Sequence, residues 1–232
     1  MSEFLFPTRP TTSIPVKGES AAFPINRIFC VGRNYAAHAV EMGGVPEYGS
    51  PFYFTKAPTH AIPSGSETPY PLGTENYHHE MEFSILIGKD TFRVSEDEAM
   101  DAVYGYCASL DMTRRDLQAH SKDKRQPWDT AKDFEDGAVF AEAIKAADFG
   151  AIGDQRITLA VNGEMRQDAT LADLIHSVPK VIADLSKYYQ LSAGDVIMTG
   201  TPAGVGAVVA GDHLHGEITG LAPVELRVGK PL

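Results

Sequence analysis

The sequence is poor in cysteine, in long apolar runs and in basic residues, and each shortage excludes a class of protein. Two cysteines among 232 residues cannot build a disulfide scaffold, and Cys30 and Cys107 lie in apolar segments, as in a reduced protein. No run of about 18 apolar residues is present, so we expect no membrane-spanning helix. Lys and Arg number 20 against 31 Asp and Glu, a net charge of −11, which argues against nucleic acids and anionic membranes as partners.

What is present is typical of one globular domain. Apolar residues make up 43% of the chain, which is enough for a hydrophobic core. The first 24 residues are rich in proline, threonine and serine, so we expect an N-terminal extended arm over residues 1–24 and a single domain over residues 25–232. Glu3, and prolines where a signal peptide needs an apolar core, favour a cytoplasmic location.

Short apolar segments alternate with turn residues, which predicts an α+β domain built mainly from strands. Strands are expected over residues 24–32, 51–56, 80–87, 103–111, 196–199, 215–218 and 224–228, with a hairpin turn at Asn162-Gly163. Helices are expected over residues 34–42, 113–122, 171–175 and 179–189, and after a capping box formed by Ser95 and Glu98. Residues 57–75 and 123–137 are expected to be irregular.

Carboxylates gather around the segment His78-His79-Glu80-Met81-Glu82. Residues i and i+2 of a strand share a face, so we expect Glu80 and Glu82 side by side. Alone, such a pair is usually a solvated face, but Asp111 adds a third acid at the end of an apolar strand. Carboxylates this close must share a proton or bind a cation. An oxygen-only ligand set selects Mg²⁺ or Mn²⁺ rather than Zn²⁺.

Further polar groups have helical spacing. His38 and Glu41 are three residues apart, so the carboxylate can orient the imidazole, although a surface pair without a role has the same spacing. Arg115 and Gln118 share a helix face. For Arg115 and for Lys132, solvent exposure is the simpler interpretation when each is taken alone.

Two glycine segments add possible moving or binding parts. Gly43-Gly44 ends the helix that carries His38, and a hinge there would let this helix act as a lid. The segment Gly200-Thr201-Pro202-Ala203-Gly204-Val205-Gly206 is similar to a phosphate loop, but it lacks the Lys-Ser/Thr pair and opens no helix. We therefore interpret it as a backbone turn that approaches a ligand.

Seven motifs together resemble those of the fumarylacetoacetate hydrolase family, in the family's order and over roughly residues 25–228. They are Val31-Gly32-Arg33-Asn34-Tyr35-x-x-His38, Phe54-x-Lys56, His78-His79-Glu80-x-Glu82, Leu110-Asp111-Met112-Thr113-x-Arg115-Asp116-x-Gln118, Ala131-Lys132-x-Phe134, Val161-Asn162-Gly163-Glu164-x-Arg166-Gln167 and Thr199-Gly200-Thr201-Pro202-x-Gly204-Val205-Gly206. The resemblance is strongest to the short, single-domain acylpyruvate hydrolases of that family.

This resemblance implies a mixed β-sandwich roll with short flanking helices, like the C-terminal domain of fumarylacetoacetase, assembled as a homodimer. It also implies a role for each matching residue. The implied metal ligands are Glu80, Glu82 and Asp111, for Mg²⁺ or Mn²⁺. The implied catalytic residues are His38, Glu41, Lys132 and Gln118, and the implied substrate-binding residues are Arg33, Lys56, Arg115 and Thr201. A further acidic ligand of the large family members has no counterpart here.

The activity implied by the resemblance is metal-dependent hydrolysis of the carbon–carbon bond of an acylpyruvate. The expected substrate is fumarylpyruvate, in gentisate-type catabolism of aromatic compounds, and Arg33 is the candidate for its distal carboxylate. The alternatives are oxaloacetate decarboxylation or 2-oxo acid isomerisation at the same metal site, and a metal-binding scaffold without activity. Retention of both His38 and Glu41 argues against the inactive scaffold.

Overall fold

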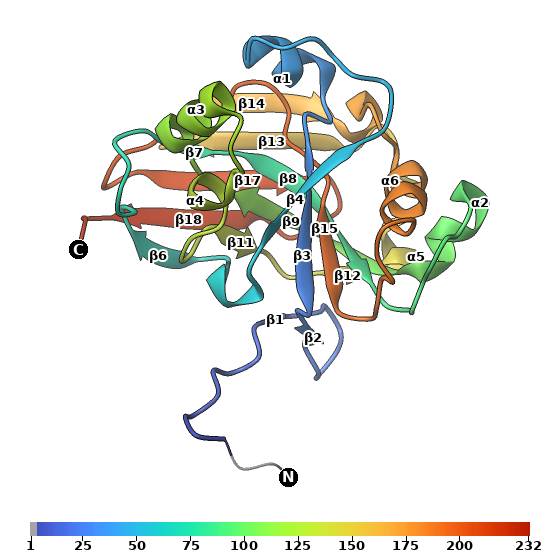
Figure 1. Cartoon of the computed structure of the whole chain (residues 1–232). Coiled ribbons are helices and arrows are strands. Elements are labelled where there is room, and N and C mark those ends of the chain that lie inside the picture. The colour runs from blue at the N-terminus through green and yellow to red at the C-terminus, as the bar shows by residue number, and fades with distance from the viewer. Residues whose placement is uncertain (1–3) are drawn as a thin grey trace.

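A curled eight-stranded sheet forms the framework of the computed structural model, which describes residues 4–232 (Figure 1). Parallel and antiparallel neighbours are mixed in it, since β3 and β15 run parallel while β8 is antiparallel to both of its neighbours. Its strands in spatial order are β4 (Phe52–Lys56), β3 (Arg27–Gly32), β15 (Asp195–Met198), β8 (Met81–Ile87), β9 (Val103–Asp111), β11 (Ala138–Phe140) and β5 (Ala61–Pro63), with β12 (Ile144–Lys145) paired to β9.

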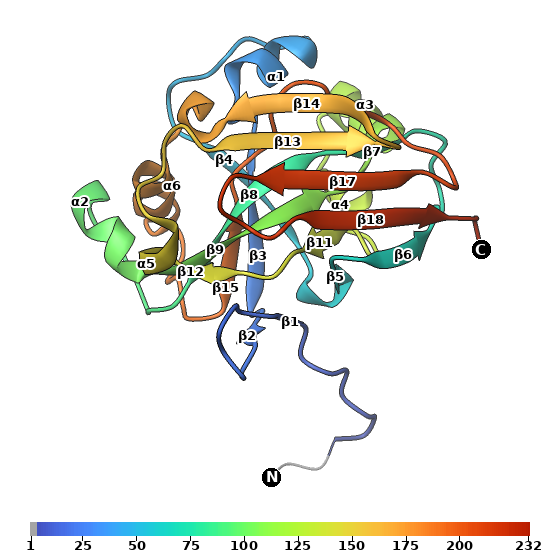
Figure 2. The same cartoon turned by 180° about the vertical axis from the view of Figure 1, so that it is seen from behind.

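A five-stranded sheet covers one face of this framework and lies in front of it in Figure 2. Its strands in spatial order are β14 (Glu164–Thr170), β13 (Arg156–Val161), β17 (His213–Ile218), β18 (Val224–Gly229) and β6 (Ser66–Pro69). Met81, Phe83 and Ile85 of β8 pack with Leu159 and Leu214 of this sheet in the larger core cluster. This arrangement is the mixed, mainly β fold predicted from the sequence.

The opposite face of the eight-stranded sheet is concave and encloses a second core cluster. Ile28 of β3, Leu86 of β8 and Phe140 of β11 belong to this one cluster, so strands far apart in the sheet order approach each other. Strand residues alternate between faces. Glu82 therefore points to the same concave side as Leu86, and Asp111 to the same side as Cys107. The acidic side chains lie at one end of the roll and the apolar ones at the other.

The N-terminal segment differs from the extended arm expected over residues 1–24, of which residues 1–3 lie outside the described part. β1 (Ser13–Ile14) pairs with β2 (Phe23–Pro24). Ile14 and Phe23 are buried in the cluster inside the roll, so residues 13–24 help to close its apolar end. Their few apolar residues are separated by Pro15, Gly18 and several polar residues, and the sequence alone did not reveal this packing.

The irregular segments predicted at residues 57–75 and 123–137 are partly wrong. β5 and β6 lie within the first, and each forms the edge of a sheet by pairing in parallel with β11 or β18. Pro63 and Pro69 favoured a loop in the sequence-based prediction. Proline is, however, tolerated in edge strands such as these. The second segment contains the one-turn helix α4 (Asp129–Lys132).

Short helices and a small sheet complete the fold. The other helices are α1 (Ala36–Glu41), α2 (Glu96–Ala99), α3 (Arg115–Lys124), α5 (Ala146–Phe149) and α6 (Val178–Leu185), and the small sheet is β10 (Thr113–Arg114), β7 (Tyr77–His79) and β16 (Gly206–Ala207). The predicted capping box of Ser95 and Glu98 and the predicted hairpin at Asn162-Gly163 are confirmed. Within residues 4–232, no helix is long and apolar enough to cross a membrane.

Candidate active site

Three buried carboxylates meet at the polar end of the roll. Glu80 lies between β7 and β8, where the chain leaves the small sheet for the large one. The Asp111 N–H donates to the Glu80 carbonyl oxygen at 2.9 Å, which places the two residues opposite each other. Glu82 follows on β8, and one oxygen of each carboxylate lies within 4.8 Å of the others. Glu80 is outside the strand predicted for it, but the expected cluster forms.

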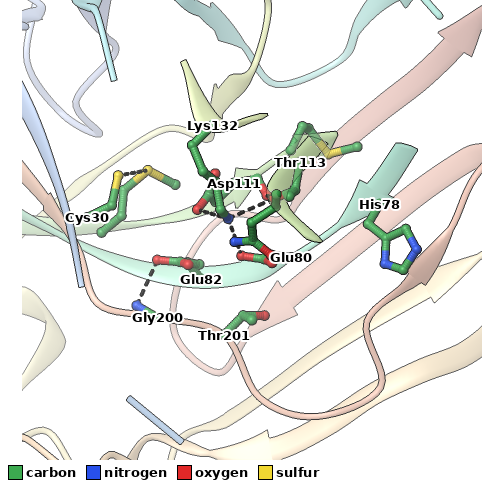
Figure 3. Close-up of polar contacts among 12 residues, drawn as sticks. Cys30, His78, Glu80, Glu82, Asp111, Thr113, Lys132, Gly200 and Thr201 are labelled. Carbon is green, nitrogen blue, oxygen red and sulfur yellow. Dashed lines mark hydrogen bonds and ion pairs between the residues drawn. The ribbon is translucent and has the colours of Figure 1, made fainter. Parts of the chain in front are cut away.

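Three cationic side chains bind these carboxylates. The Lys132 ammonium donates to Glu80 Oε2, Asp111 Oδ2 and Thr113 Oγ1, each at 2.7 Å (Figure 3). Arg115 donates to the other oxygen of Glu80. Lys56 Nζ lies 2.8 Å from Asp111 Oδ1, and its side chain is fully buried. Two of the three carboxylates are therefore held rigidly by charged partners.

Glu82 has a different environment. Its one side-chain hydrogen bond within residues 4–232 comes from the Gly200 N–H, at 2.7 Å. Burial and the negative charges of Asp111 and Glu80 raise the pKa of Glu82. In contrast, Lys132 and Arg115 overcome the effect of burial and bring the pKa of Glu80 far below its usual range. An oxygen-only set with one uncompensated carboxylate fits a divalent cation such as Mg²⁺ or Mn²⁺.

A histidine–carboxylate pair lies beside this cluster. The His38 ring is buried on α1, and its Nδ1 bonds Glu41 Oε2 at 3.0 Å. The second oxygen of Glu41 accepts the Gly204 N–H at 2.9 Å. Burial lowers the pKa of His38 below its ordinary value, so the ring is neutral at neutral pH and its Nε2 can accept a proton.

One cavity connects the two groups. Among the residues predicted from the sequence, those that line it are Arg33, His38, Glu80, Glu82, Arg115, Gln118, Lys132 and Thr201. Asp111 lies beneath the cavity, fully buried. Glu41 stands behind His38 as its hydrogen-bond partner. The structure therefore brings all eleven predicted residues to the site or to its supporting contacts, with Lys56 among the supporting contacts through Asp111.

Three basic residues have surroundings that change their expected roles. Lys56 lies behind Asp111, where it also donates to backbone carbonyls that include Gly137 O at 2.9 Å, so it holds the Asp111 carboxylate in place and does not reach the cavity. Lys132 uses its three N–H donors on protein oxygens, which leaves none for an oxyanion. Arg115 is likewise bound to Glu80. The family resemblance implies a catalytic role for Lys132 and a substrate-binding role for Arg115, but in the structure their charges are balanced by Glu80 and Asp111.

Gln118 has a side-chain amide that can still donate a hydrogen bond to a ligand, as its implied catalytic role requires. Its side-chain oxygen accepts an N–H of Arg115 at 2.6 Å. This bond fixes the orientation of the amide, and the NH₂ group makes no hydrogen bond within the described residues. Thr201 is similar, because its hydroxyl oxygen accepts from Gln167 at 2.8 Å and the hydroxyl proton remains available to a ligand.

Sequence reasoning missed several residues of the cavity wall. Lys122, Trp128, Phe54 and Met42 all line it. Lys122 had a usable signal, since it lies four residues after Gln118 and continues the same helix face. The aromatic residues had none, because β4 and the segment before α4 come together only in the folded chain.

Gln167 is a further residue whose role the sequence did not reveal. Its oxygen accepts the Met81 N–H at 3.0 Å and bonds His79 Nδ1 at 3.1 Å. Its NH₂ group donates to Thr201 Oγ1 and to Pro202 O, both at 2.8 Å. This buried amide therefore joins the segment that carries Glu80 and Glu82 to the loop that borders the cavity.

The family of this chain follows from a match over most of its length. Residues 27–229 match the model of the fumarylacetoacetate hydrolase C-terminal domain. The chain belongs to the fumarylacetoacetate hydrolase family. The resemblance inferred from the seven motifs is thereby confirmed, over nearly the same part of the chain.

Individual members of the fumarylacetoacetate hydrolase family agree with this assignment. A fumarylpyruvate hydrolase of Ralstonia sp is 52% identical over 179 residues, which are 77% of this chain and 92% of that protein. The oxaloacetate tautomerase YcgM of Escherichia coli is 40% identical over 200 residues, 85% of this chain and 90% of its own. The crystal structure of fumarylpyruvate hydrolase from Pseudomonas aeruginosa with Mn²⁺ and pyruvate superposes with a TM-score of 0.95 at 40% identity, covering 98% of this chain and 100% of that one.

Proposed function

We propose that this member of the family hydrolyses the carbon–carbon bond of an acylpyruvate, with fumarylpyruvate as substrate and fumarate and pyruvate as products, in gentisate-type catabolism. The observation that carries the proposal is the single cavity that His38 shares with Glu80 and Glu82. Similarity to two fumarylpyruvate hydrolases supports a hydrolase of carbon–carbon bonds over an inactive scaffold.

A divalent cation is part of this proposal. Glu80, Glu82 and Asp111 would hold Mg²⁺ or Mn²⁺, which when bound would supply Lewis-acid stabilisation for an enolate. The fumarylpyruvate hydrolase structure with Mn²⁺ supports a metal of this class. Lys132, Arg115 and Lys56 would keep the carboxylates in place while the substrate enters and leaves.

The reaction steps follow from the side chains. His38 Nε2, with Nδ1 held by Glu41, takes a proton from water, and the hydroxide adds to the 4-carbonyl carbon; such a base is typically worth about 10²–10⁴ in rate. The NH₂ group of Gln118 donates to the oxygen that becomes negative. The C3–C4 bond then breaks, and its electron pair goes to C3 of the pyruvate enolate. Protonated His38 returns the proton to C3, and the Thr201 hydroxyl binds the 1-carboxylate.

Oxaloacetate tautomerisation is a second candidate, favoured by the similarity to the tautomerase YcgM. This reaction is a 2-oxo acid isomerisation, which is one of the alternative activities that the sequence left open. The same His38 could move a proton between C3 and solvent without adding water to a carbonyl. A tautomerase or a decarboxylase of oxaloacetate would need neither Gln118 at a second carbonyl nor room for a long acyl group.

The experiment is a side-by-side assay of the purified protein with Mg²⁺ and with Mn²⁺ on fumarylpyruvate, acetylpyruvate and oxaloacetate. Hydrolysis is followed by the loss of the diketo absorbance and by pyruvate release, and tautomerisation by the loss of enol absorbance without pyruvate release. We expect the highest kcat/KM on fumarylpyruvate. Fast oxaloacetate tautomerisation with no pyruvate from either diketo acid would replace the first candidate with the second.

We further propose that the enzyme works as a homodimer, as the family resemblance implies, and that it acts in the cytoplasm. Sedimentation velocity of the purified protein measures the assembly directly. A species of twice the chain mass of 25.1 kDa is expected at micromolar concentration, and a monomer there would remove the dimer from the proposal. Cell fractionation tests the location.

A further inference from the structure

Four basic side chains line the cavity, and they fall into two pairs. Arg115 and Lys132 are bound to the carboxylate cluster. Arg33 and Lys122 have no carboxylate within 4.0 Å among residues 4–232. The Nε of Arg33 is also buried without a hydrogen-bond partner. A partly buried cation without an anion is costly, so two of them facing one cavity point to an anionic ligand.

Helix α3 sets the distance between Lys122 and the proposed metal ligands. Arg115, Gln118 and Lys122 all line the cavity from one face of α3. An α-helix rises about 1.5 Å per residue, so Gln118 and Lys122 start about 4.5 and 10.5 Å beyond Arg115 along the axis. Because Arg115 binds Glu80, this row leads away from the carboxylate cluster and ends at Lys122.

We propose that Lys122, together with Arg33, forms a subsite for the distal carboxylate of a long dianionic 2-oxo acid. This rests on the proposed function, since fumarylpyruvate carries a carboxylate at each end of a seven-carbon chain. Its 2-oxo acid end lies at the metal ligands, its 4-carbonyl beside Gln118 and its distal carboxylate at Lys122. The extended seven-carbon chain has a length comparable to the row on α3. A four-carbon diacid such as oxaloacetate is too short to span it.

Aromatic rings support the two cations without neutralising them. Lys122 Nζ lies 5.3 Å from the centroid of a Trp128 ring, and the Arg33 guanidinium carbon lies 5.9 Å from that of Phe52. In such contacts the ring quadrupole attracts the cation, but the ring has no net charge and does not neutralise it. Trp128, which lines the cavity, also gives the unsaturated middle of the acyl chain an apolar wall. The subsite therefore combines charge with a flat apolar surface.

The charge distribution around Lys122 agrees with this assignment. Burial and the positive charges of Arg33 and Arg115 lower the pKa of Lys122 to about 8, and Lys132 acts in the same direction, while Glu80 opposes them. A bound carboxylate would compensate the repulsion between Lys122 and Arg33. The Arg33 backbone is also left-handed, with φ 55°, a conformation that is uncommon for a non-glycine residue and is typical of functional positions.

The test measures binding without turnover, on the full-length protein loaded with Mn²⁺. The probes are 2-oxoheptanedioate and 2-oxoheptanoate, which match the chain length of fumarylpyruvate and differ from each other only by the distal carboxylate. Neither has a 4-carbonyl, so neither can be hydrolysed. The variant is Lys122→Met, and the matched control is Lys124→Met on the same helix, an exposed lysine paired with its neighbour Asp123.

We expect calorimetry to show that the wild-type protein and the Lys124→Met control prefer the diacid, and that Lys122→Met loses about 10–150-fold of this preference, as for a charge-assisted hydrogen bond. No preference in the wild type, or equal losses for both probes in Lys122→Met, would overturn the subsite. A parallel assay compares kcat/KM for fumarylpyruvate and acetylpyruvate. If neither is hydrolysed but the diacid preference depends on Lys122, the proposed reaction fails and the subsite remains.

Discussion

The Gly204 N–H donates to one carboxylate oxygen of Glu41 at 2.9 Å, and the other oxygen of that carboxylate bonds His38 at 3.0 Å. Four residues earlier in the same loop, the Gly200 N–H donates to Glu82 at 2.7 Å. One loop therefore positions both the proposed general base and the proposed metal ligand that lacks a cationic partner. Hydrolysis of an acylpyruvate needs the two together, and this loop sets their relative position.

The glycine at position 204 is expected to be essential for activity. Its φ is +97°, and a Cβ there would lie 2.0 Å from the Arg166 carbonyl oxygen. Gly211 has φ +99° but open space around it, so it is a matched control for the conformational cost alone. We expect Gly204→Ala to lose much of the about 10²–10⁴ in kcat that a positioned base contributes, while Gly211→Ala keeps it. Equal losses in the two variants would assign the effect to the conformational cost of a side chain at positive φ and not to the Glu41 contact.

Replacement of His38 should affect the chemical step and not metal binding. We expect His38→Ala to lower kcat by at least about 10², the lower end for a general base, with an unchanged calorimetric affinity for Mg²⁺. A variant that keeps the wild-type kcat would mean that another group takes the proton.

The pH profile gives an independent test of His38. Burial lowers its pKa below 6.5, so the neutral, proton-accepting form persists below that pH. The acid limb of kcat/KM should therefore lie below pH 6.5. Glu41→Gln removes a charge that raises this pKa, and the limb should move to still lower pH. A limb above pH 6.5 in the wild type would contradict the assignment.

Two of the three proposed metal ligands, Asp111 and Glu82, should respond differently to substitution. Asp111→Ala leaves two buried ammonium groups, Lys56 and Lys132, without this partner, which typically destabilises a protein by about 3–5 kcal/mol. The Glu82 carboxylate accepts a single hydrogen bond from residues 4–232, donated by a backbone N–H. We expect Glu82→Gln to abolish calorimetric Mg²⁺ binding while the metal-free protein unfolds at nearly the wild-type denaturant concentration. Retained Mg²⁺ affinity in Glu82→Gln would remove Glu82 from the metal site.

Arg33→Gln tests the other half of the proposed subsite. If Arg33 contacts the distal carboxylate, KM for fumarylpyruvate should rise, and the kcat/KM ratio of fumarylpyruvate to acetylpyruvate should fall by about 10–150-fold, as for loss of one charge-assisted hydrogen bond. Equal losses on both substrates would mean that Arg33 supports the cavity as a whole and does not select the long diacid.

Lys122 predicts a pH effect on substrate preference. The groups that face it are Arg33, Arg115, Lys132 and Glu80, and its pKa is lowered to about 8. Above that pH the free enzyme loses the Lys122 charge, so the preference for fumarylpyruvate over acetylpyruvate should fall as pH rises through about 8. Lys122→Met should make the ratio insensitive to pH in this range. A ratio that stays constant in the wild type from pH 7 to 9 would contradict the prediction.

The sequence by itself determined the local parts of the candidate site. Glu80 and Glu82 are two residues apart, and His38 and Glu41 are three apart. Backbone periodicity predicts from these spacings that the side chains of each pair lie close together. Their contacts in the structure agree with these spacings. The strand Val103–Asp111 was predicted with its bounds, because an apolar run between a capped helix and an acidic residue needs no distant partner to be recognised.

The tertiary structure decided which distant segments meet. The edge strand β5 forms because β11 pairs with it, and no local pattern encodes that pairing. The charges of Lys56 and Lys132 are balanced because the sheet curls and brings β4 and α4 against Asp111. The charge of Lys122 stays without an ion pair because the fold brings no carboxylate of residues 4–232 within 4.0 Å of it. Backbone periodicity sets the face on which a side chain lies, but the partner it meets depends on pairing and curvature over the whole chain.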